Sequence, residues 1–524
     1  MNTITKNKFI KNHSSNKTTY FFKVLALAML TTFASCEENL DEIPKDKFAE
    51  TNFFTKPEHA LLALNSTYRY LSPDGSTVWG AAYTGIVAQS SATTDEMVVS
   101  WGDAVWPNLA QLNFSESFPS EALYVFYRAL MPAVTTCTIN IGKIEAMTNL
   151  SDADKKSYIA QLKALRAHYT WILYNHYGGV PIRVDYKEAI NINAAPIPRL
   201  TNEQTFAQIE KDYKEAIADL PTLAAQAGSD YGRFTKDAAY MGLVKLYMHD
   251  KKWNDVITTS RIIMGMGHSL QTNYTDLFSF ANKGNKQEIL FALSTKFNST
   301  PTNIWLAHAL PGNYVGNYYD KDENRNTLTQ WGGYKMPWST YDKFDKTDKR
   351  TARLLAKWLI EDPNDKSPKP KLIEFDARAN KYIGAIPMKF NVDPTGTGYG
   401  QGTDVVIWRY ADVLLSLAEA INETSGPTAE AYDLIGQVRK RAGLANIPAG
   451  LSKDQFRDKL MDERLFEFWN EGGIRREDLI RWGKYIQFAK DRGSAFAKNE
   501  FVLLPIPRAA IDASGGVIKQ NPGY

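Results

Sequence analysis

Cysteine and histidine are scarce in this sequence. Its 524 residues include two cysteines, Cys36 and Cys137, and seven histidines. Two cysteines are too few for a disulfide framework, and none of the histidines belongs to an H-E-x-x-H zinc motif. The sequence therefore gives no support to a disulfide-rich scaffold or to a zinc hydrolase.

Basic charge is also lacking once the N-terminus is set aside. The formal net charge is +3, but residues 1–35 contain several lysines and no acidic residue. The remaining chain is slightly acidic, so it lacks the basic surface with which proteins bind nucleic acid. Hydrophobic residues make up 44% and charged residues 23% of the sequence, which is typical of a globular protein with a sizeable core.

The N-terminus joins a polar, basic segment to an apolar stretch at residues 20–34. This stretch is shorter than the roughly 20 apolar residues that span a bilayer, so the pattern predicts a secretory signal peptide. It ends in Ala34, Ser35 and Cys36, which resembles a lipobox in which Phe33 replaces the usual Leu. We predict that residues 1–35 are removed and that Cys36 is lipidated. The alternative is an ordinary signal peptide with a chance cysteine.

Apolar residues recur at helical spacing through most of the body. Gly178, Pro221 and Gly426 follow three of the periodic segments, as expected where helices end. Helices in succession, joined by tight turns, suggest tetratricopeptide-like pairs. We therefore expect a mainly α fold, an α-α superhelix of such pairs with long irregular loop insertions. The predicted helices include residues 162–176, 206–220, 239–247, 253–263, 413–418, 432–438, 456–468 and 479–482.

Two long stretches, about 72–120 and 265–405, interrupt the helical pattern. Both are rich in Gly, Pro, Asn, Asp and aromatic residues, and they hold most of the 12 tryptophans. Long irregular segments inside a compact protein are usually functional. These two insertions are therefore where we expect a binding site.

Several short motifs, in order along the chain, resemble those of the SusD/RagB family. One departure is at residues 474–476, where the family's arginine usually follows the glycine more closely. No single motif is specific to this family, but the occurrence of all of them in the same order is. The motifs are TTDEM at 93–97, RAHY at 166–169, YGGVP at 177–181, WRYADVLL at 408–415, AEA at 418–420, VRKRAG at 438–443, ERLFE at 463–467, DLIRWG at 478–483, LPIP at 504–507 and QNPGY at 520–524.

The resemblance implies an outer-membrane lipoprotein built on tetratricopeptide-like helix pairs. Such proteins lie over a SusC-like TonB-dependent transporter, bind glycans or in some members peptides, and pass them inward. They have no catalytic site and no cofactor. The acidic residues after Cys36, which include Glu37 and Glu38, resemble the surface-export signal of Bacteroidetes lipoproteins, with a plain solvated linker as the alternative.

The expected organisation follows from these observations. Residues 1–35 form the signal peptide and 36–50 an acidic tether. Residues 51–260 form an N-terminal SusD-like region, and 261–524 a C-terminal region that includes the insertion at 265–405. If Cys36 carries lipid, Cys137 is left alone, and we expect it to be a buried small hydrophobe.

Carbohydrate binding needs flat aromatic faces and a few placed polar groups. Each candidate ring has an alternative role, which is to pin its loop onto the helical body. Asp103 and Asn108 are candidates for contacts to sugar hydroxyls. The aromatic candidates are Trp101, Trp106, Trp331 and Tyr334, followed by Trp79 and Tyr318.

Catalytic and metal sites find little support in the sequence. Asp95 and Glu96 form the most visible carboxylate pair, but adjacent side chains point in different directions along a strand or a helix. His176 lies on the apolar face of its helix, where a core role is expected. Residues 320–331 resemble a calcium loop only faintly, because position six is Arg325 and position twelve is Trp331. We therefore expect no enzyme, no metal site and no cofactor.

The function we expect is capture of oligosaccharides at the cell surface and their delivery to a SusC-like transporter. The main alternative is a peptide- or other nutrient-binding protein of the same architecture, for which we expect a deep polar cavity instead of exposed aromatic rings. A scaffold without a ligand is the third reading, and the aromatic insertions argue against it. The charged residues Glu463, Arg464, Glu467 and Arg481 are expected to form a structural ion-pair network between the last helices.

Overall fold

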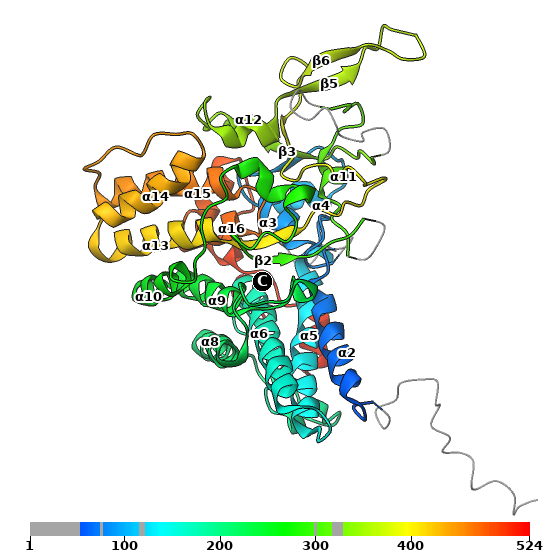
Figure 1. Ribbon diagram of the computed structural model, residues 1–524, viewed down its shortest axis with the longest axis vertical. Coiled ribbons are helices and arrows are strands. Elements are labelled where there is room, and N and C mark those ends of the chain that lie inside the picture. Colours follow the sequence, from blue (N-terminus) through cyan, green and yellow to red (C-terminus); the bar gives the residue numbers. More distant parts are fainter. Residues whose placement is uncertain (1–52, 74–76, 115–120, 298–300, 317–327) are drawn as a thin grey trace, which may run out of the picture. The chain divides into compact units, whose positions relative to one another are not determined.

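The structure is a computed structural model that describes residues 53–73, 77–114, 121–297, 301–316 and 328–524. Two compact units are distinguished, residues 1–56 and 57–524. In the part of the first unit that is described, the rings of Phe53 and Phe54 lie edge to face with centroids 4.7 Å apart. The predicted signal peptide and tether, with Cys36, lie outside the described residues. The second unit holds all the helices and strands described below (Figure 1).

The second unit begins with three packed helices, α2 (Pro57–Tyr68), α5 (Glu121–Ala146) and α6 (Asp152–Tyr177). Ser151 caps α6 by accepting a hydrogen bond from the backbone of Asp154, and Gly178 ends it with φ +72°. The periodic pattern predicted α6 but missed α5. Among the described helices, only α5 is long and apolar enough to cross a membrane, and here it packs against α2 and α6.

The next three helices confirm the predicted pairs. They are α8 (Asn202–Asp219), α9 (Lys236–His249) and α10 (Trp253–Met264), with the short α7 (Tyr186–Ile190) before them. Thr201 and Gln204 form a capping box at the start of α8. Each helix packs on the next along the chain, as in a superhelix of helix pairs (Figure 1).

The C-terminal part adds further helices on the same plan. α13 (Tyr410–Ser425) packs against α10, α14 and α15, so the two helical series form one body. Gly426 ends α13 with φ +81°, as its position after the periodic residues predicted. The later helices are α14 (Ala429–Arg441), α15 (Lys453–Phe468), α16 (Ile474–Arg481), α17 (Tyr485–Asp491) and α18 (Arg508–Ala513). The described chain is mainly α, as expected.

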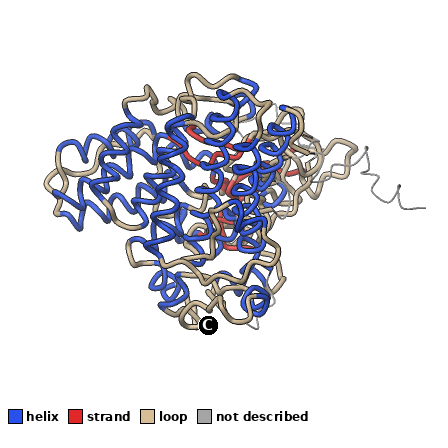
Figure 2. Tube along the Cα trace, turned by 90° about the horizontal axis from the view of Figure 1, so that it is seen from below, coloured by secondary structure: helices blue, strands red, loops and turns tan. Residues whose placement is uncertain are grey.

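The two insertions contain short elements that the sequence did not predict. Figure 2 shows the short strands among the helices and loops. β3 lies between β1 and β7 in a four-stranded sheet of order β1-β3-β7-β4, while β2 pairs with β8 and β5 with β6. The elements are α3 (Ile86–Ala92), β1 (Val98–Val99), α4 (Val105–Ala110), β2 (Ile289–Leu293), α11 (Trp305–Ala309), β3 (Tyr334–Pro337), α12 (Trp338–Tyr341), β4 (Leu354–Leu355), β5 (Lys357–Glu361), β6 (Leu372–Asp376), β7 (Gly384–Pro387) and β8 (Val405–Arg409).

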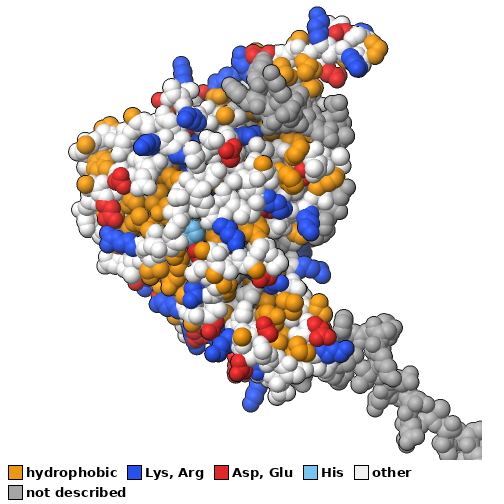
Figure 3. Space-filling view, viewed as in Figure 1, with side chains coloured by type: hydrophobic (Ala, Val, Ile, Leu, Met, Phe, Trp, Pro, Cys, Tyr) orange, Lys and Arg blue, Asp and Glu red, His pale blue; other side chains and the backbone are white. Residues whose placement is uncertain are grey.

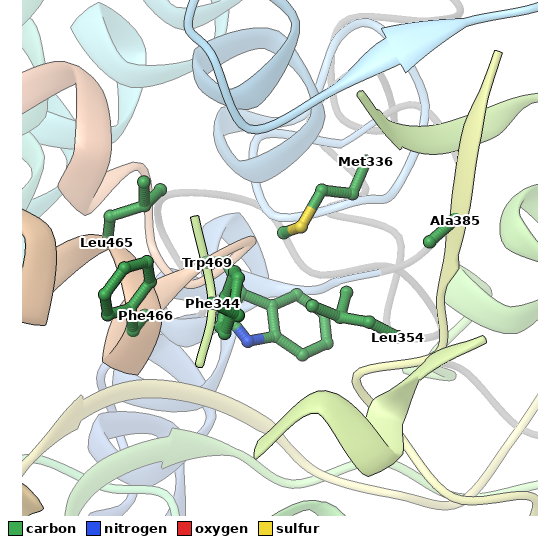
Figure 4. Close-up of a cluster of buried hydrophobic side chains, with 7 residues drawn as sticks. All are labelled: Met336, Phe344, Leu354, Ala385, Leu465, Phe466 and Trp469. Carbon is green, nitrogen blue, oxygen red and sulfur yellow. The ribbon is translucent and has the colours of Figure 1, made fainter. Parts of the chain in front are cut away.

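A buried apolar cluster joins the second insertion to the helical body. Met336 of β3, Ala385 of β7 and Leu354 of β4 pack with Phe466 and Trp469 from the end of α15 (Figure 4). Burying such side chains stabilises the fold by roughly 1.5–3 kcal/mol each. The cluster therefore holds β3, and the residues just before it, on a rigid helical support.

Ion pairs join the last helices, as the sequence predicted. Arg464 of α15 pairs with Asp478 of α16 at 2.7 Å. Glu463 of α15 instead accepts a hydrogen bond at 2.7 Å from Arg350, which belongs to the second insertion, and all four side chains are buried. Cys137 is fully buried, and burial raises the pKa of its thiol far above the usual value. This agrees with the predicted role of Cys137 as a small core residue.

Candidate ligand-binding site

Two exposed rings lie side by side on the surface of the second insertion. The indole of Trp331 and the phenol ring of Tyr399 have centroids 6.3 Å apart and planes that differ by 20°. They are 47% and 55% exposed, which is unusual for large rings packed against each other. Nearly parallel, accessible ring faces are the geometry that stacks on a flat ligand. We call Trp331 and Tyr399 the aromatic pair.

Backbone hydrogen bonds fix both members of the aromatic pair. The Trp331 amide donates to the carbonyl of Ala307 in α11 at 2.7 Å, and the Gly333 amide donates to that of His308 at 2.8 Å. The loop that carries Tyr399 is joined to the same segment, because the Thr329 amide donates to the Gly398 carbonyl at 2.8 Å. The two rings are therefore positioned by backbone contacts between segments far apart in the sequence.

Trp101 supports the aromatic pair from the first insertion. Its indole N–H donates to the carbonyl of Trp331 at 3.1 Å. The indole ring also lies directly on Gly333, where a Cβ atom would stand 2.2 Å from the ring. Only glycine permits this approach. Trp101 is half-buried, so its free edge continues the aromatic surface toward α4.

The other predicted rings lie beneath this surface. Trp106 is 3% exposed and Tyr334 is fully buried, and their ring centroids are 5.5 Å apart. Trp79 is 4% exposed and stacks on His168. The buried rings do not present a face to solvent in this structure, so their direct contact with a ligand stays a prediction. They match the alternative role of pinning loops to the body, and Trp106 and Tyr334 both contact Trp101.

Of the two polar candidates, one is exposed and the other is bonded within its own turn. Asp103 is exposed beside Trp101, so it stays a candidate for a ligand hydroxyl. Asn108 is tied into its own turn, where it donates to the Ala104 carbonyl at 2.7 Å and accepts from Asn113 at 2.7 Å. Tyr318 lies outside the described residues. Tyr399 was not among the rings that were named from the sequence.

Comparison with known proteins agrees with the fold and the motifs. Residues 264–494 match the profile of the SusD family, and residues 124–248 match a profile described as starch-binding associating with outer membrane. The chain belongs to the SusD/RagB family. The SusD-family profile covers the second insertion, which carries both rings of the aromatic pair, whereas Trp101 lies outside both matched ranges.

Relatives match this SusD-family protein over nearly its whole length. A SusD-like protein P25 of Formosa agariphila is 24% identical, covering 94% of this chain and 97% of its own. A SusD homologue of Bacteroides thetaiotaomicron has a TM-score of 0.76 at 23% identity, over 91% of this chain and 99% of its own. A surface glycan-binding protein A of the same species, solved with laminarihexaose, has a TM-score of 0.69 at 22% identity, over 89% of this chain and all of its own.

His308 and Lys335 lie directly behind the aromatic pair and have shifted pKa values. Burial lowers the pKa of His308 to about 4, so its ring is neutral at physiological pH. This ring stacks on Tyr334 and meets Trp331 edge to face at 4.7 Å. Burial also lowers the pKa of Lys335 to about 8, and its ammonium donates to the carbonyl of Gly332. The charge of Lys335 therefore helps to hold the segment that carries Trp331.

The visible carboxylate pair, Asp95 and Glu96, does not converge on one point. The Asp95 carboxylate accepts from Arg475 at 2.8 and 2.9 Å, whereas Glu96 accepts from Ser91 at 2.8 Å. Burial opposes ionisation of Asp95, but Arg475 outweighs it and lowers the pKa to about 2. Burial raises the pKa of Glu96 to about 8. The two carboxyls are therefore held in different surroundings, each inside the core. In the part of the chain that the structure describes, no group of His, Cys, Asp and Glu is arranged to hold a metal ion.

The raised pKa of Glu96 gives a prediction about stability. Between the unfolded value of 4.5 and the folded value of about 8, the folded state binds the extra proton, so stability falls as pH rises through this window. Glu96→Gln mimics the protonated carboxyl and is expected to unfold at a higher temperature than the unmodified protein at pH 8. At pH 4.5 the two proteins should melt together. Thermal melts at both pH values test this, and equal melting temperatures at pH 8 would contradict it.

Proposed function

We propose that this protein is a cell-surface lipoprotein that captures oligosaccharides and delivers them to a SusC-like TonB-dependent transporter in the outer membrane, without catalysing a reaction on them. The observation that carries the proposal is the aromatic pair. Its two accessible, nearly parallel rings offer apolar faces for stacking, and a sugar ring presents a matching apolar face of C–H groups. The exposed Asp103, two residues after the supporting Trp101, is available for sugar hydroxyls.

The way the aromatic pair is supported favours binding over a purely structural role. A ring that only pins a loop is buried, as Trp106 and Tyr334 are. The carbonyl of Trp331 instead accepts a hydrogen bond from Trp101, and its amide donates one to Ala307. Trp331 nevertheless stays about half exposed. Fixing an exposed aromatic ring in advance lowers the entropy lost when a ligand binds. The arrangement is thus prepared for a partner that lies on the ring faces.

The comparisons support the ligand class and the location. One structural neighbour is a surface glycan-binding protein in complex with laminarihexaose, and one matching profile is described as starch-binding associating with outer membrane. Lipid anchoring at Cys36, exposure to the cell exterior and the SusC-like partner rest on the N-terminal motif and on the family resemblance. A peptide ligand is the alternative, and the open aromatic surface favours a glycan.

Replacement of either ring in the aromatic pair tests the proposal. Trp331→Ala and Tyr399→Ala are each expected to weaken glycan binding about tenfold, because one stacking contact is worth roughly 1–3 kcal/mol. Phe496→Ala is the matched control, since Phe496 is an equally exposed ring (47%) that does not belong to the pair. Affinity electrophoresis against a polysaccharide panel, followed by calorimetry with the best oligosaccharide, measures the effect.

Two outcomes would count against the proposal. The first is a protein that binds no polysaccharide in the panel but binds peptides. The second is a glycan affinity that Trp331→Ala and Tyr399→Ala leave as unchanged as Phe496→Ala does, which would move the site elsewhere. Both variants remove largely exposed rings, so their melting temperatures are expected to stay close to that of the unmodified protein.

A further inference from the structure

We infer that a second pocket, distinct from the aromatic pair, binds an acidic sugar unit through Arg69. The pocket has a volume of about 770 Å³ and is formed by the end of α2, the 3-10 turn η1 (Arg69–Leu71), the loop at 229–233 and the end of β2. None of its lining residues belongs to the aromatic pair or its supports. Its volume lies within the range of small-molecule sites, roughly 300–1,000 Å³.

The pocket combines apolar walls with an open polar rim. Leu71 and Leu293 are buried on the inside, while Leu62 on α2 is 46% exposed at the mouth. Figure 3 shows hydrophobic side chains next to acidic and basic ones over α2. An apolar wall of this kind suits the C–H face of a sugar ring, and the open mouth allows a longer chain to extend outward.

Among the described residues that line the pocket, the charge is of one sign. Two guanidinium groups, those of Arg69 and Arg233, belong to this described lining, and no described carboxylate does. Arg233 is already occupied: it pairs with Asp230 at 3.2 Å and donates to Asn65 at 2.6 Å. Arg69 is exposed, and within the described residues its guanidinium makes no hydrogen bond or ion pair. The free charged donor among the described residues of this pocket is therefore Arg69, which suits a carboxylate or sulfate group.

Unused hydrogen-bonding groups on the rim favour a sugar over a fatty acid. Within the part of the chain that is described, the hydroxyls of Ser229 and Ser294 and the amide nitrogen of Asn65 have no protein partner, and all three residues line the pocket. A fatty acid would use the apolar wall and Arg69 but leave these groups unpaired. A sugar acid supplies hydroxyls for them as well as the negative charge.

The walls are fixed before any ligand binds. The Tyr68 hydroxyl donates to Gln161 at 3.0 Å and accepts from the Phe234 amide at 2.9 Å, and the guanidinium of Arg233 lies over the Tyr68 ring at 5.4 Å. Gly232 follows the 3-10 turn η2 (Gly228–Asp230) with φ +92°, a conformation that favours glycine. The pocket is thus preformed and open, and the free charge among its described residues, that of Arg69, points to an anionic ligand.

The test uses the full chain in detergent with D-glucuronate as the probe, and D-glucose and octanoate as comparisons. Saturation-transfer NMR titration is expected to show that glucuronate binds more tightly than glucose or octanoate. Arg69→Gln should weaken glucuronate binding about tenfold, as expected for the loss of one charge-assisted hydrogen bond. Ser294→Leu keeps the charge but fills the pocket and should also weaken binding. Arg508→Gln, at an exposed pair with Asp512, is the matched control and should have no effect.

The choice of a sugar as the ligand rests on the proposed function, whereas the pocket at Arg69 does not depend on it. Variants at the two sites distinguish a failure of the proposed function from a failure of this inference. Trp331→Ala should weaken glycan binding at the aromatic pair and leave glucuronate binding unchanged, whereas Arg69→Gln should do the reverse. Glucuronate binding that survives both Arg69→Gln and Ser294→Leu would overturn the inference, as would the absence of glucuronate binding. Octanoate binding more tightly than glucuronate would overturn the assignment to a sugar.

Discussion

Replacing Arg409 with Met is expected to lower the free energy of unfolding by about 3–5 kcal/mol. Arg409 is 1% exposed and contacts three buried carboxylates. It donates to Glu471 at 2.7 and 3.0 Å and to Glu288 at 2.9 Å, and it pairs with Glu467. Methionine fills a similar volume but leaves these carboxylates with less positive charge in a region that water does not reach. Denaturant unfolding followed by circular dichroism measures the change.

The pH dependence of this effect follows from the pKa of Glu467. Burial alone would raise this pKa, but Arg409, Arg441 and Arg350 hold it far below the usual value. A depressed carboxyl pKa stabilises the folded state above the unfolded value of 4.5 and loses this effect as pH falls. Without Arg409 the folded pKa rises, so the difference between the variant and the unmodified protein should be large at pH 7 and should shrink in acid.

An exposed ion pair provides the control for Arg409→Met. Arg261 and Glu430 pair at 2.9 Å with side chains that are 56% and 46% exposed. Exposed pairs contribute only about 0–1 kcal/mol, so Arg261→Met should change stability little at any pH. An Arg409→Met protein as stable as Arg261→Met would show that the network around Arg409 does not hold the fold together.

Gly333→Ala is expected to weaken glycan binding about tenfold or more while the helical body stays folded. The added Cβ would stand 2.2 Å from the indole of Trp101, so that ring must move away. The hydrogen bond from Trp101 to the carbonyl of Trp331 is then lost, and Trp331 loses its support from the first insertion. An ångström of misplacement in a prepared site has a large effect on binding. Calorimetry with the oligosaccharide used for the aromatic pair measures the affinity.

Gly102→Ala is the matched control for Gly333→Ala. It lies next to Trp101 in the sequence, and an added Cβ there meets no atom within 4 Å. The affinity of Gly102→Ala should equal that of the unmodified protein. If Gly333→Ala also bound normally, the contact of Trp101 with this glycine would have no part in preparing the site.

Much of the helical frame could be read from local pattern. Gly178 and Gly426 follow periodic apolar residues and end α6 and α13 as predicted, because glycine alone adopts the left-handed backbone of a helix C-terminus without strain. α5 escaped prediction although it is long and apolar. It contains Pro132, a residue that argues against a continuous helix.

The sequence located the candidate site to two segments but not to particular residues. The aromatic content of the two insertions predicted where a site would lie, and Trp331 was among the rings named. Composition does not say which ring faces solvent, however. Trp106 and Trp331 have the same side chain, yet one is 3% and the other 47% exposed. Tyr399 was missed because a tyrosine among glycines has the local signature of a loop.

The sequence by itself determined the mainly α class, the family and the two insertions, because helix periodicity, capping residues and short motifs are local properties of the chain. Only the tertiary structure decided that Trp331 and Tyr399 stack, that Trp101 lies on Gly333, and that Arg69 is left free in a preformed pocket. The physical reason is that exposure and ring contact depend on segments up to hundreds of residues apart. Their pairing is set by the packing of the whole unit, and no local pattern records it.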